Sequence, residues 1–320
     1  MSDSTLVTGA YGLLGGWLVG ALLKRGTQVT VLHRDDRPES GLALMGLESR
    51  VSVVHGDLTQ DGLIDRALAE YDVDTVFHLA AQTLVPTANR SPLSTFETNV
   101  RGTWLLLEAC RRHEVSRVVV ASSDKAYGFQ PELPYREEQP LEARFPYDVS
   151  KAAADLLARS YWHTWGLPVV VTRFANLYGG GDFNFSRLIP EAVTAALSGR
   201  NPVIRSDGSP ERDFLYVEDA VGAYLAIADA LGRGEGAGQA FNAGGGAPHR
   251  VLDVVQTVCR LSGTGVVPDV RGQGTPAGEI DRQWVDYRRL HDLTGWTPAV
   301  ALEDGLGRTI DWYRRHGFER

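Results

Sequence analysis

Cysteine, methionine and long apolar runs are scarce in this chain. Its 320 residues include two cysteines and two methionines. Cys110 and Cys259 give neither a disulfide framework nor a metal-ligand spacing, so both are predicted to be small core residues and no metal site is expected. No apolar stretch approaches the ~20 residues needed to cross a membrane. A strand is predicted from Thr5, too early for a signal peptide, so we expect a cytoplasmic protein with no membrane partner.

An excess of positive charge is also missing. Lysine and arginine number 32 against 40 aspartates and glutamates, which leaves a net charge of −8. This balance argues against a nucleic-acid partner, and an anionic substrate would need a locally basic pocket. The hydrophobic content of 43% and charged content of 22% are ordinary for a globular protein. The length suffices for one large domain or two interleaved ones.

Short apolar strands alternate with helices in the first half of the chain. Strands are predicted at residues 5–8, 28–33, 51–55, 75–78, 117–122 and 168–174. Helices are predicted at residues 13–24, 61–70, 92–113 and 149–166. This alternation predicts an α/β fold with a doubly wound parallel sheet of the Rossmann type.

The alternation of strands and helices is less regular in the second half of the chain. Helices are predicted at residues 187–198, 217–231, 251–261 and 303–315, with short strands at 203–205 and 266–268. We therefore predict a first domain over residues 1–174, to which 217–231 returns. Residues 175–320 are predicted to form a smaller C-terminal α/β domain.

Three glycines follow the first predicted strand and open the first predicted helix. Gly9, Gly12 and Gly15 would allow a tight turn and the close approach of a pyrophosphate to the helix N-terminus. The acid that usually binds the adenosine ribose of NAD is absent at His33. Arg34 could instead meet the 2′-phosphate of NADP, or the acids that follow it could contact the ribose, and both interpretations stay open.

Tyr147 and Lys151 lie one helical turn apart in a predicted helix, on a shared face. A tyrosine that acts as a base near neutral pH needs its phenolate stabilised by roughly 4 kcal/mol. One ammonium about 5 Å away supplies roughly 3 kcal/mol at an effective dielectric constant of about 20. An oxidised nicotinamide would supply the rest. The pair indicates redox chemistry on a hydroxyl, and Asp124-Lys125 indicates a step after the oxidation.

Further motifs occur in a fixed order along the chain. They are Gly9-x-x-Gly12-x-x-Gly15, His55-Gly-Asp57, His78-Leu-Ala-Ala81, Asn99, Ser122-Ser123, Tyr147-x-x-x-Lys151, Arg173-Phe-Ala-Asn176-x-Tyr-Gly179, Arg212-Asp-Phe-Leu-Tyr-Val-Glu-Asp219 and Leu293-Thr-Gly-Trp-Thr-Pro298. Together they resemble the extended short-chain dehydrogenase/reductase superfamily, in its nucleotide-sugar epimerase/dehydratase branch. The motifs are most similar to those of CDP-glucose 4,6-dehydratases.

The resemblance implies that the first domain holds NAD or NADP, tightly bound and recycled, and that the second holds the substrate. Asp57 would bond the adenine amine, Ala80 and Ala81 would line the pyrophosphate, and Lys151 would bond the nicotinamide ribose. The full cofactor set implied is Gly9, Gly12, Leu13, Leu14, Gly15, His33, Arg34, Asp57, Leu58, Leu79, Ala80, Ala81, Asn99, Ser122, Tyr147 and Lys151.

The resemblance also suggests the chemistry. Ser123 would assist Tyr147 at the sugar 4-hydroxyl, and the pair Asp124-Lys125 occurs where CDP-glucose 4,6-dehydratases carry Asp-Lys. Once C4 is a ketone, loss of water across C5–C6 needs an acid near the C6 hydroxyl and a base near C5. Asp124 could be the acid and Lys125 the base, or Lys125 could be only a salt-bridge partner.

The expected function is an NAD(P)-dependent nucleotide-sugar 4,6-dehydratase that yields a 4-keto-6-deoxy sugar nucleotide. A 4-epimerase is the alternative, and a dinucleotide-binding sensor without turnover is less favoured. The partner implied is a nucleoside-diphosphate hexose, whose nucleotide base stays open. Its implied contacts are Thr83, Ser123, Asn176, Arg187, Leu188, Arg205, Arg212 and Arg282. A homodimer is implied through the helical stretches 92–113 and 149–166.

Overall fold

A seven-stranded parallel sheet forms the centre of the molecule in the computed structural model, which describes residues 3–36, 39–274 and 280–318. The strand order is β10-β6-β5-β4-β1-β2-β3. The bounds are β1 (Ser4–Thr8), β2 (Gln28–His33), β3 (Ser52–His55), β4 (Thr75–His78), β5 (Arg117–Ala121), β6 (Val169–Phe174) and β10 (Ala240–Ala243). The order reverses between β1 and β4, as in a Rossmann-type fold, so the predicted fold class is confirmed.

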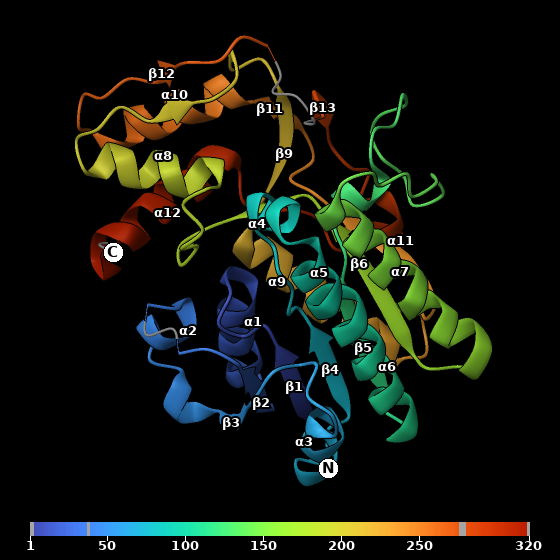
Figure 1. The fold of residues 1–320 in the computed structure, drawn as a ribbon. Coiled ribbons are helices and arrows are strands. Elements are labelled where there is room, and N and C mark those ends of the chain that lie inside the picture. Colours follow the sequence, from blue (N-terminus) through green and yellow to red (C-terminus); the bar gives the residue numbers. More distant parts are fainter. Residues whose placement is uncertain (1–2, 37–38, 275–279, 319–320) are drawn as a thin grey trace.

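The sheet is buried on both faces, because successive side chains of a strand point to opposite sides. In β1, Val7 packs with α1 (Leu13–Lys24) and α9 (Val217–Gly232), whereas Leu6 belongs to the core on the other face. That second core is closed by α3 (Leu63–Glu70), α6 (Gly102–Arg112) and α7 (Pro146–Trp165). Figure 1 shows α6 and α7 side by side along one flank of the sheet.

Most of the elements after β6 form a second body at one end of the sheet (Figure 1). Strand β9 (Glu211–Tyr216) pairs with β7 (Asn176–Tyr178), β11 (Pro248–Arg250) and β13 (Arg282–Gln283). Helices α8 (Leu188–Leu197), α10 (Val251–Ser262) and α12 (Leu302–His316) pack together beside the short pair β8 (Val203–Ile204) and β12 (Asp269–Val270). The loop between the two bodies places Gly180 against Trp17 of α1, whose Nε1 donates to the Gly180 carbonyl at 2.8 Å.

Several elements differ from the sequence-based expectations. The strand predicted at residues 266–268 is instead β12, at residues 269–270, because these are the residues that pair with β8. The helix predicted at residues 92–113 consists of α5 (Pro92–Phe96), a π-helical turn η2 (Glu97–Arg101) and α6. Strands β7, β9, β10, β11 and β13 and helices α2 (Gly41–Leu44), α4 (Val85–Arg90) and α11 (Arg288–Thr294) were not predicted.

Two segments of the second half pack with the first sheet. Helix α9 packs against α1 and β5, and β10 forms the edge strand beside β6. The division at residue 174 stays a prediction, but β10 shows that a strand assigned to the second domain completes the sheet of the first. Within the described ranges, no helix is long and apolar enough to cross a membrane.

Candidate active site

The candidate site lies where the carboxyl ends of β1, β4, β5 and β6 meet, which is the edge where open α/β sheets bind ligands. The glycine loop follows β1, and Leu79–Ala81 follow β4. The turn η3 (Asp124–Tyr127) follows β5 after Ser122 and Ser123, and Asn176 follows β6. The sequence motifs thus converge on one edge of the sheet.

The glycine loop has no room for a side chain at Gly9 or Gly15. Gly9 has a φ of 74°, and a Cβ there would lie 2.7 Å from the backbone nitrogen of Ala80. A Cβ at Gly15 would lie 2.2 Å from the Gly9 carbonyl oxygen. Gly12 is the N-cap residue of α1 and makes no side-chain hydrogen bond to the helix. The N–H groups of the first turn, including those of Leu13 and Leu14, have no partner within the helix. These features fit a dinucleotide pyrophosphate at the helix N-terminus.

The end of β2 combines stacked rings with a paired arginine. His33 stacks on Tyr11 with ring centroids 4.2 Å apart. The Arg34 guanidinium lies 2.7 Å from Asp35 Oδ2 and 3.7 Å from Asp57 Oδ2. Burial alone would raise the pKa of Asp57, but hydrogen bonds from Thr59 and the charge of Arg34 hold that pKa below its usual value. Arg34 therefore faces two carboxylates at the predicted adenosine end, and Leu58 is buried beside Asp57.

Asn99 lies in the π-helical turn η2, a kind of bulge that is frequent at functional sites. Its Oδ1 accepts the Gln82 N–H at 2.7 Å, and its Nδ2 donates to the Gln82 carbonyl at 3.0 Å and to Ser150 Oγ at 2.9 Å. The side chain thus joins the segment after β4 to α7. Its proposed contact with the cofactor stays a prediction, and so does that of half-buried Thr83 with the substrate.

Lys151 is buried and tied to β5. Its Nζ donates to the Ala121 carbonyl at 2.9 Å, while Ser122 Oγ donates to the Lys151 carbonyl at 3.0 Å. Burial lowers the pKa of Lys151 to about 8. The neighbouring His78, held by Thr8 and Thr103, has a pKa lowered to about 3 by burial and by the Lys151 charge.

Tyr147 is buried, and burial raises its pKa to about 12. The charge of Arg187 opposes this rise most strongly, and a hydrogen bond with the Ser123 side chain also opposes it. Lys151 is not among these groups, and the expectation that it stabilises the phenolate stays a prediction. Arg187 enters as an electrostatic partner that the sequence did not reveal.

Asp124 opens the turn η3 and is nearly inaccessible, with 3% of its surface exposed. Ser123 Oγ donates to its Oδ1 at 3.0 Å and accepts the Lys125 N–H at 3.2 Å. Within the described part of the chain, Asp124 Oδ2 is a buried atom without a hydrogen-bond partner. Burial raises the pKa of Asp124, and the charges of Lys125 and Arg212 oppose the rise. Such a group can hold a proton and has an oxygen free to pass it on.

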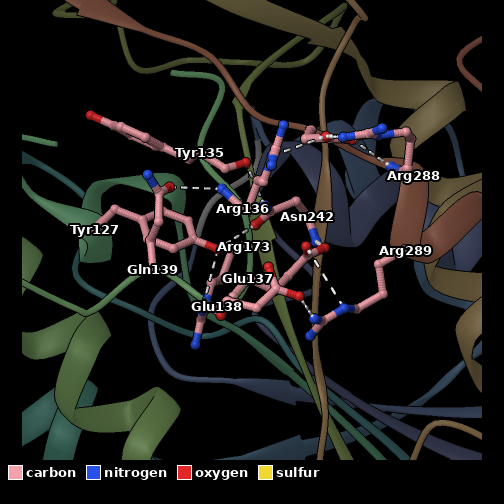
Figure 2. Close-up of polar contacts among 11 residues, drawn as sticks. Tyr127, Tyr135, Arg136, Glu137, Glu138, Gln139, Arg173, Asn242, Arg288 and Arg289 are labelled. Atoms are coloured by element: carbon pink, nitrogen blue, oxygen red, sulfur yellow. Dashed lines mark hydrogen bonds and ion pairs between the residues drawn. The ribbon is translucent and has the colours of Figure 1, made fainter. Parts of the chain in front are cut away.

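A buried polar network packs against this turn, and Figure 2 shows its members Tyr127, Tyr135, Arg173 and Asn242. Arg173 forms a two-pronged ion pair with Asp155 of α7, at 2.7 and 3.0 Å, and donates to Tyr127 Oη at 3.0 Å. Tyr127 Oη donates to Asn242 Oδ1 at 2.8 Å, and Asn242 Nδ2 donates to the Tyr135 carbonyl at 3.0 Å. The network links η3, α7, β6 and β10, and of its members the sequence analysis had placed only Arg173 in a motif.

The four arginines predicted to bind the substrate differ in their exposure and in their partners. Arg187 pairs with buried Asp182 at 3.0 Å and caps α8, which begins at Leu188. Arg212 donates to the carbonyls of Glu211 and Asp281, both at 3.0 Å, and its charge acts on Asp124.

The other two arginines lie further out. Arg282 pairs with Glu211 at 2.7 Å and stacks over Trp284, and more than half of its side chain is exposed. Arg205 is exposed after β8 and acts electrostatically on Glu191 of α8. Arg187 and Arg212 thus act on the groups around Tyr147 and Asp124. Asn176 Nδ2 donates to the Asp213 carbonyl at 3.0 Å. No group of three potential metal ligands occurs among the residues that the structure describes.

Comparison with known proteins agrees with this geometry. Residues 5–244 match the family described as NAD dependent epimerase/dehydratase. The chain is 33% identical to a dTDP-glucose 4,6-dehydratase of Xanthomonas campestris pv. campestris, over 96% of this chain and 92% of the relative. It is 34% identical to a dTDP-glucose 4,6-dehydratase of Streptomyces niveus, over 97% of this chain and 92% of that relative.

Solved structures give the same picture. The dTDP-glucose 4,6-dehydratase of Streptomyces venezuelae, with NAD bound, superposes with a TM-score of 0.86 at 32% identity, covering 98% of this chain and 97% of that one. The UDP-glucose 4-epimerase of Thermotoga maritima superposes with a TM-score of 0.89 at 26% identity, covering 98% and 99%. The likeness to CDP-glucose enzymes stays a prediction.

The cofactor of this family is NAD, and the glycine loop at the N-terminus of α1 has the shape that its pyrophosphate needs. The match spans most of the chain and includes every candidate catalytic position from Ser123 to Lys151. The chain therefore belongs to the NAD-dependent epimerase/dehydratase family of enzymes.

Proposed function

We propose that this enzyme is a nucleotide-sugar 4,6-dehydratase that uses NAD and releases a 4-keto-6-deoxy sugar nucleotide. The observation that carries the proposal is Asp124, a buried carboxyl with one unpartnered oxygen beside Ser123. Oxidation at C4 needs only a base and a hydride acceptor, so a second acid indicates a further step. The similarity to enzymes named 4,6-dehydratases supports the same reaction.

Tyr147, Ser123 and Lys151 serve the oxidation in this proposal. Tyr147 takes the proton of the sugar 4-hydroxyl, and Ser123 holds that hydroxyl in place. NAD, when bound at the glycine loop, would supply the hydride acceptor for C4 and the hydride for C6. Lys151, held at Ala121, presents a positive charge to the ribose of the cofactor. Arg34 is already paired with Asp35 and Asp57, which supports NAD rather than NADP.

Asp124 and Lys125 serve the loss of water. Asp124 gives its proton to the C6 oxygen as the C6–O bond breaks, and the electrons of the C5–H bond form the C5–C6 double bond. Lys125, as the base, takes the C5 proton and returns it to C5 after hydride reaches C6.

A nucleoside diphosphate suits the basic groups beside these residues. Arg187 and Arg212 act electrostatically on Tyr147 and Asp124, and a guanidinium fork binds phosphate oxygens in a bidentate manner. In a chain with a net charge of −8, these two arginines supply the local positive field that an anionic substrate needs.

A 4-epimerase is the second candidate, because the fold superposes on a UDP-glucose 4-epimerase as well as on dehydratases. An epimerase returns hydride to C4 and has no use for an acid at C6. The buried Asp124 therefore favours the dehydratase. A sensor without turnover would not need the catalytic side chains Ser123, Tyr147 and Lys151, so their presence argues against that function.

The proposal predicts that Asp124→Asn separates the two half-reactions. The variant should still oxidise C4 but should lose water at least about 10²-fold more slowly, the usual contribution of an acid catalyst. Reduced cofactor would then accumulate in a single turnover and can be followed by its absorbance. Asp229→Asn, which removes an exposed carboxylate paired with Arg25, is the control and should behave as wild type. Full dehydration by Asp124→Asn would contradict the role of Asp124.

We also propose that the protein is a homodimer joined through α5, α6 and α7. These helices lie together in Figure 1 and carry exposed apolar side chains, among them Leu93 (73% exposed) and Leu156 (58% exposed). Apolar side chains gathered on one face commonly mark a protein interface.

Leu156→Asp should therefore convert the dimer to a monomer, measured by light scattering after gel filtration, because a carboxylate would be buried at the interface without a partner. Val267→Asp places the same charge at an equally exposed site (59%) away from these helices and should leave the mass unchanged. A dimeric Leu156→Asp variant, or a monomeric wild type, would contradict this interface.

A further inference from the structure

Asp124 and Lys125 lie in the single turn η3, and Tyr127 is the last residue of that turn. The Gly128 N–H donates to the Lys125 carbonyl at 3.1 Å and closes the turn. Side chains three residues apart in a 3₁₀ turn lie one above the other, and those of Asp124 and Tyr127 are both buried, at 3% and 0% exposed. A displacement of Tyr127 would therefore displace Asp124 as well.

The hydroxyl of Tyr127 attaches the turn to the central sheet. Arg173 Nη1 of β6 donates to Tyr127 Oη at 3.0 Å, and Tyr127 Oη donates to Asn242 Oδ1 of β10 at 2.8 Å. Arg173 is itself fixed by Asp155, at 2.7 and 3.0 Å. A hydrogen bond from an ionised donor is roughly twice as strong as one between neutral groups, so this attachment is firm.

The other hydrogen bonds of the turn do not reach the sheet. Ser123 Oγ donates to Asp124 Oδ1 at 3.0 Å and accepts the Lys125 N–H at 3.2 Å, so both bonds would move with the turn. The Tyr127 carbonyl accepts the Glu142 N–H at 3.2 Å, but Glu142 belongs to the segment between η3 and α7. The Tyr127 hydroxyl therefore fixes the turn relative to β6 and β10.

The groups proposed for the oxidation are attached separately. Ser122, which precedes Ser123, donates its N–H to the Thr172 carbonyl at 2.9 Å and its Oγ to the Lys151 carbonyl at 3.0 Å. Tyr147 and Lys151 lie on α7. Loss of the hydroxyl that holds the turn would thus leave these bonds in place.

We propose that Tyr127 is a positioning residue for the loss of water, and that its hydroxyl holds the Asp124-Lys125 turn in place against β6 and β10. The proposal rests on the dehydratase function. A misplacement of about 1 Å can slow an enzymatic step by about 10²-fold. Removal of this hydroxyl should therefore slow the loss of water and spare the oxidation at C4.

Tyr127→Phe tests this role by separating the two steps. Arg173 would keep its ion pair and its bond to the Glu137 carbonyl at 3.2 Å, so we expect the variant to fold, as circular dichroism would check. In a single turnover, reduced cofactor should form within about threefold of the wild-type rate, whereas water loss should be about 10- to 100-fold slower. Tyr178→Phe removes another buried hydroxyl, bonded to the Leu302 carbonyl at 3.3 Å, and should leave both steps unchanged. Equal slowing of both steps in Tyr127→Phe, or slowing of neither, would overturn the proposal.

Asn242→Ala tests the same attachment from β10. It removes the acceptor of the Tyr127 hydroxyl and should also slow the loss of water alone. Because both changes break one attachment, the double variant should be little slower than the slower single variant. A folded Asn242→Ala variant with wild-type water loss, or fully additive losses, would overturn the proposal even if Tyr127→Phe fails to fold.

Infrared spectroscopy of the ligand-free protein tests the attachment without turnover. At acid pH, the difference between each protein and its Asp124→Asn counterpart isolates the carbonyl stretch of the Asp124 carboxyl. In Tyr127→Phe, water should reach Asp124 Oδ2, which has no partner among the described residues, and the band should move to lower frequency. Tyr178→Phe should leave it in place.

The infrared result distinguishes the failure of this proposal from the failure of the dehydratase function. An unmoved band in Tyr127→Phe would overturn the positioning role even if the wild type releases a dehydrated product. A moved band in an enzyme that releases only an isomer would retain Tyr127 as the attachment of the turn and would overturn its part in the loss of water together with the dehydratase function.

Discussion

Replacing Tyr147 by phenylalanine is expected to lower kcat by about 10²- to 10⁴-fold, the range for loss of a positioned acid–base group. The change removes a single oxygen atom from a buried side chain, so the fold should be kept. Ser123 and Lys151 would remain at the start of η3 and on α7, but no group would be left to take the proton of the sugar hydroxyl. Oxidation at C4 would fail, and every later step would fail with it.

The binding of the substrate should change much less than the rate. Arg187 and Arg212, the proposed diphosphate contacts, are untouched by the change at Tyr147, so KM should stay within a few-fold of wild type. Steady-state kinetics together with calorimetric titration of the nucleoside diphosphate would separate the two effects. A fall in affinity with kcat retained would contradict the assignment of Tyr147 as the base.

Tyr161 provides a matched control on the same helix. Its hydroxyl contacts Glu108 at 3.4 Å in a partly exposed place far along α7 from Tyr147. Tyr161→Phe removes the same atom and should leave kcat within about twofold. A large loss in both variants would indicate that α7 is disturbed by either change rather than that Tyr147 carries the chemistry.

The second large effect is expected on stability, at the ion pair between Arg173 and Asp155. Their side chains are 1% and 0% exposed. Arg173→Met removes the two-pronged partner of buried Asp155 and leaves it the partly exposed Arg159 at 3.8 Å. Loss of the main partner of a buried charge typically costs about 3–5 kcal/mol, so the variant should lower the free energy of unfolding by about that amount. Urea-induced unfolding followed by circular dichroism would measure it.

Two further variants separate the charge from the packing. Arg173→Met combined with Asp155→Leu removes both charges and should recover part of the loss, because no isolated charge stays buried. Arg25→Met breaks an exposed pair with Asp229 and should change the free energy of unfolding by less than about 1 kcal/mol. Equal effects at the buried and the exposed pair would contradict this account of the Arg173–Asp155 pair.

The parts of the fold that could be predicted are the elements determined by residues adjacent in the sequence. Strand β1 and helix α1 were placed within a residue, because an apolar strand, three spaced glycines and an apolar helix follow one another. Strand β10 was missed because its four residues acquire a strand conformation only by pairing with β6, far away in the sequence. The π-helical turn at Asn99 was missed because the sequence alone reads as one continuous helix.

The same distinction between local motifs and contacts of distant segments applies to the candidate site. The glycine loop, Tyr147, Lys151 and Asp124 could be named from the sequence because each lies within a short motif. The effects of Arg187 on Tyr147 and of Arg212 on Asp124 could not, since each joins residues from different parts of the chain. Spacing placed Lys151 beside Tyr147 on α7, but it could not show that the Lys151 ammonium donates to the Ala121 carbonyl of β5.

The mass of the product tests the central proposal most directly. The purified enzyme would be incubated with dTDP-, UDP-, CDP- and GDP-glucose in turn, with Tyr147→Phe as the blank, and the released cofactor would be identified on denaturation. We predict that at least one sugar nucleotide yields a product lighter by one molecule of water and that the cofactor is NAD. An isomer of unchanged mass from every substrate that turns over would contradict the dehydratase and leave the 4-epimerase.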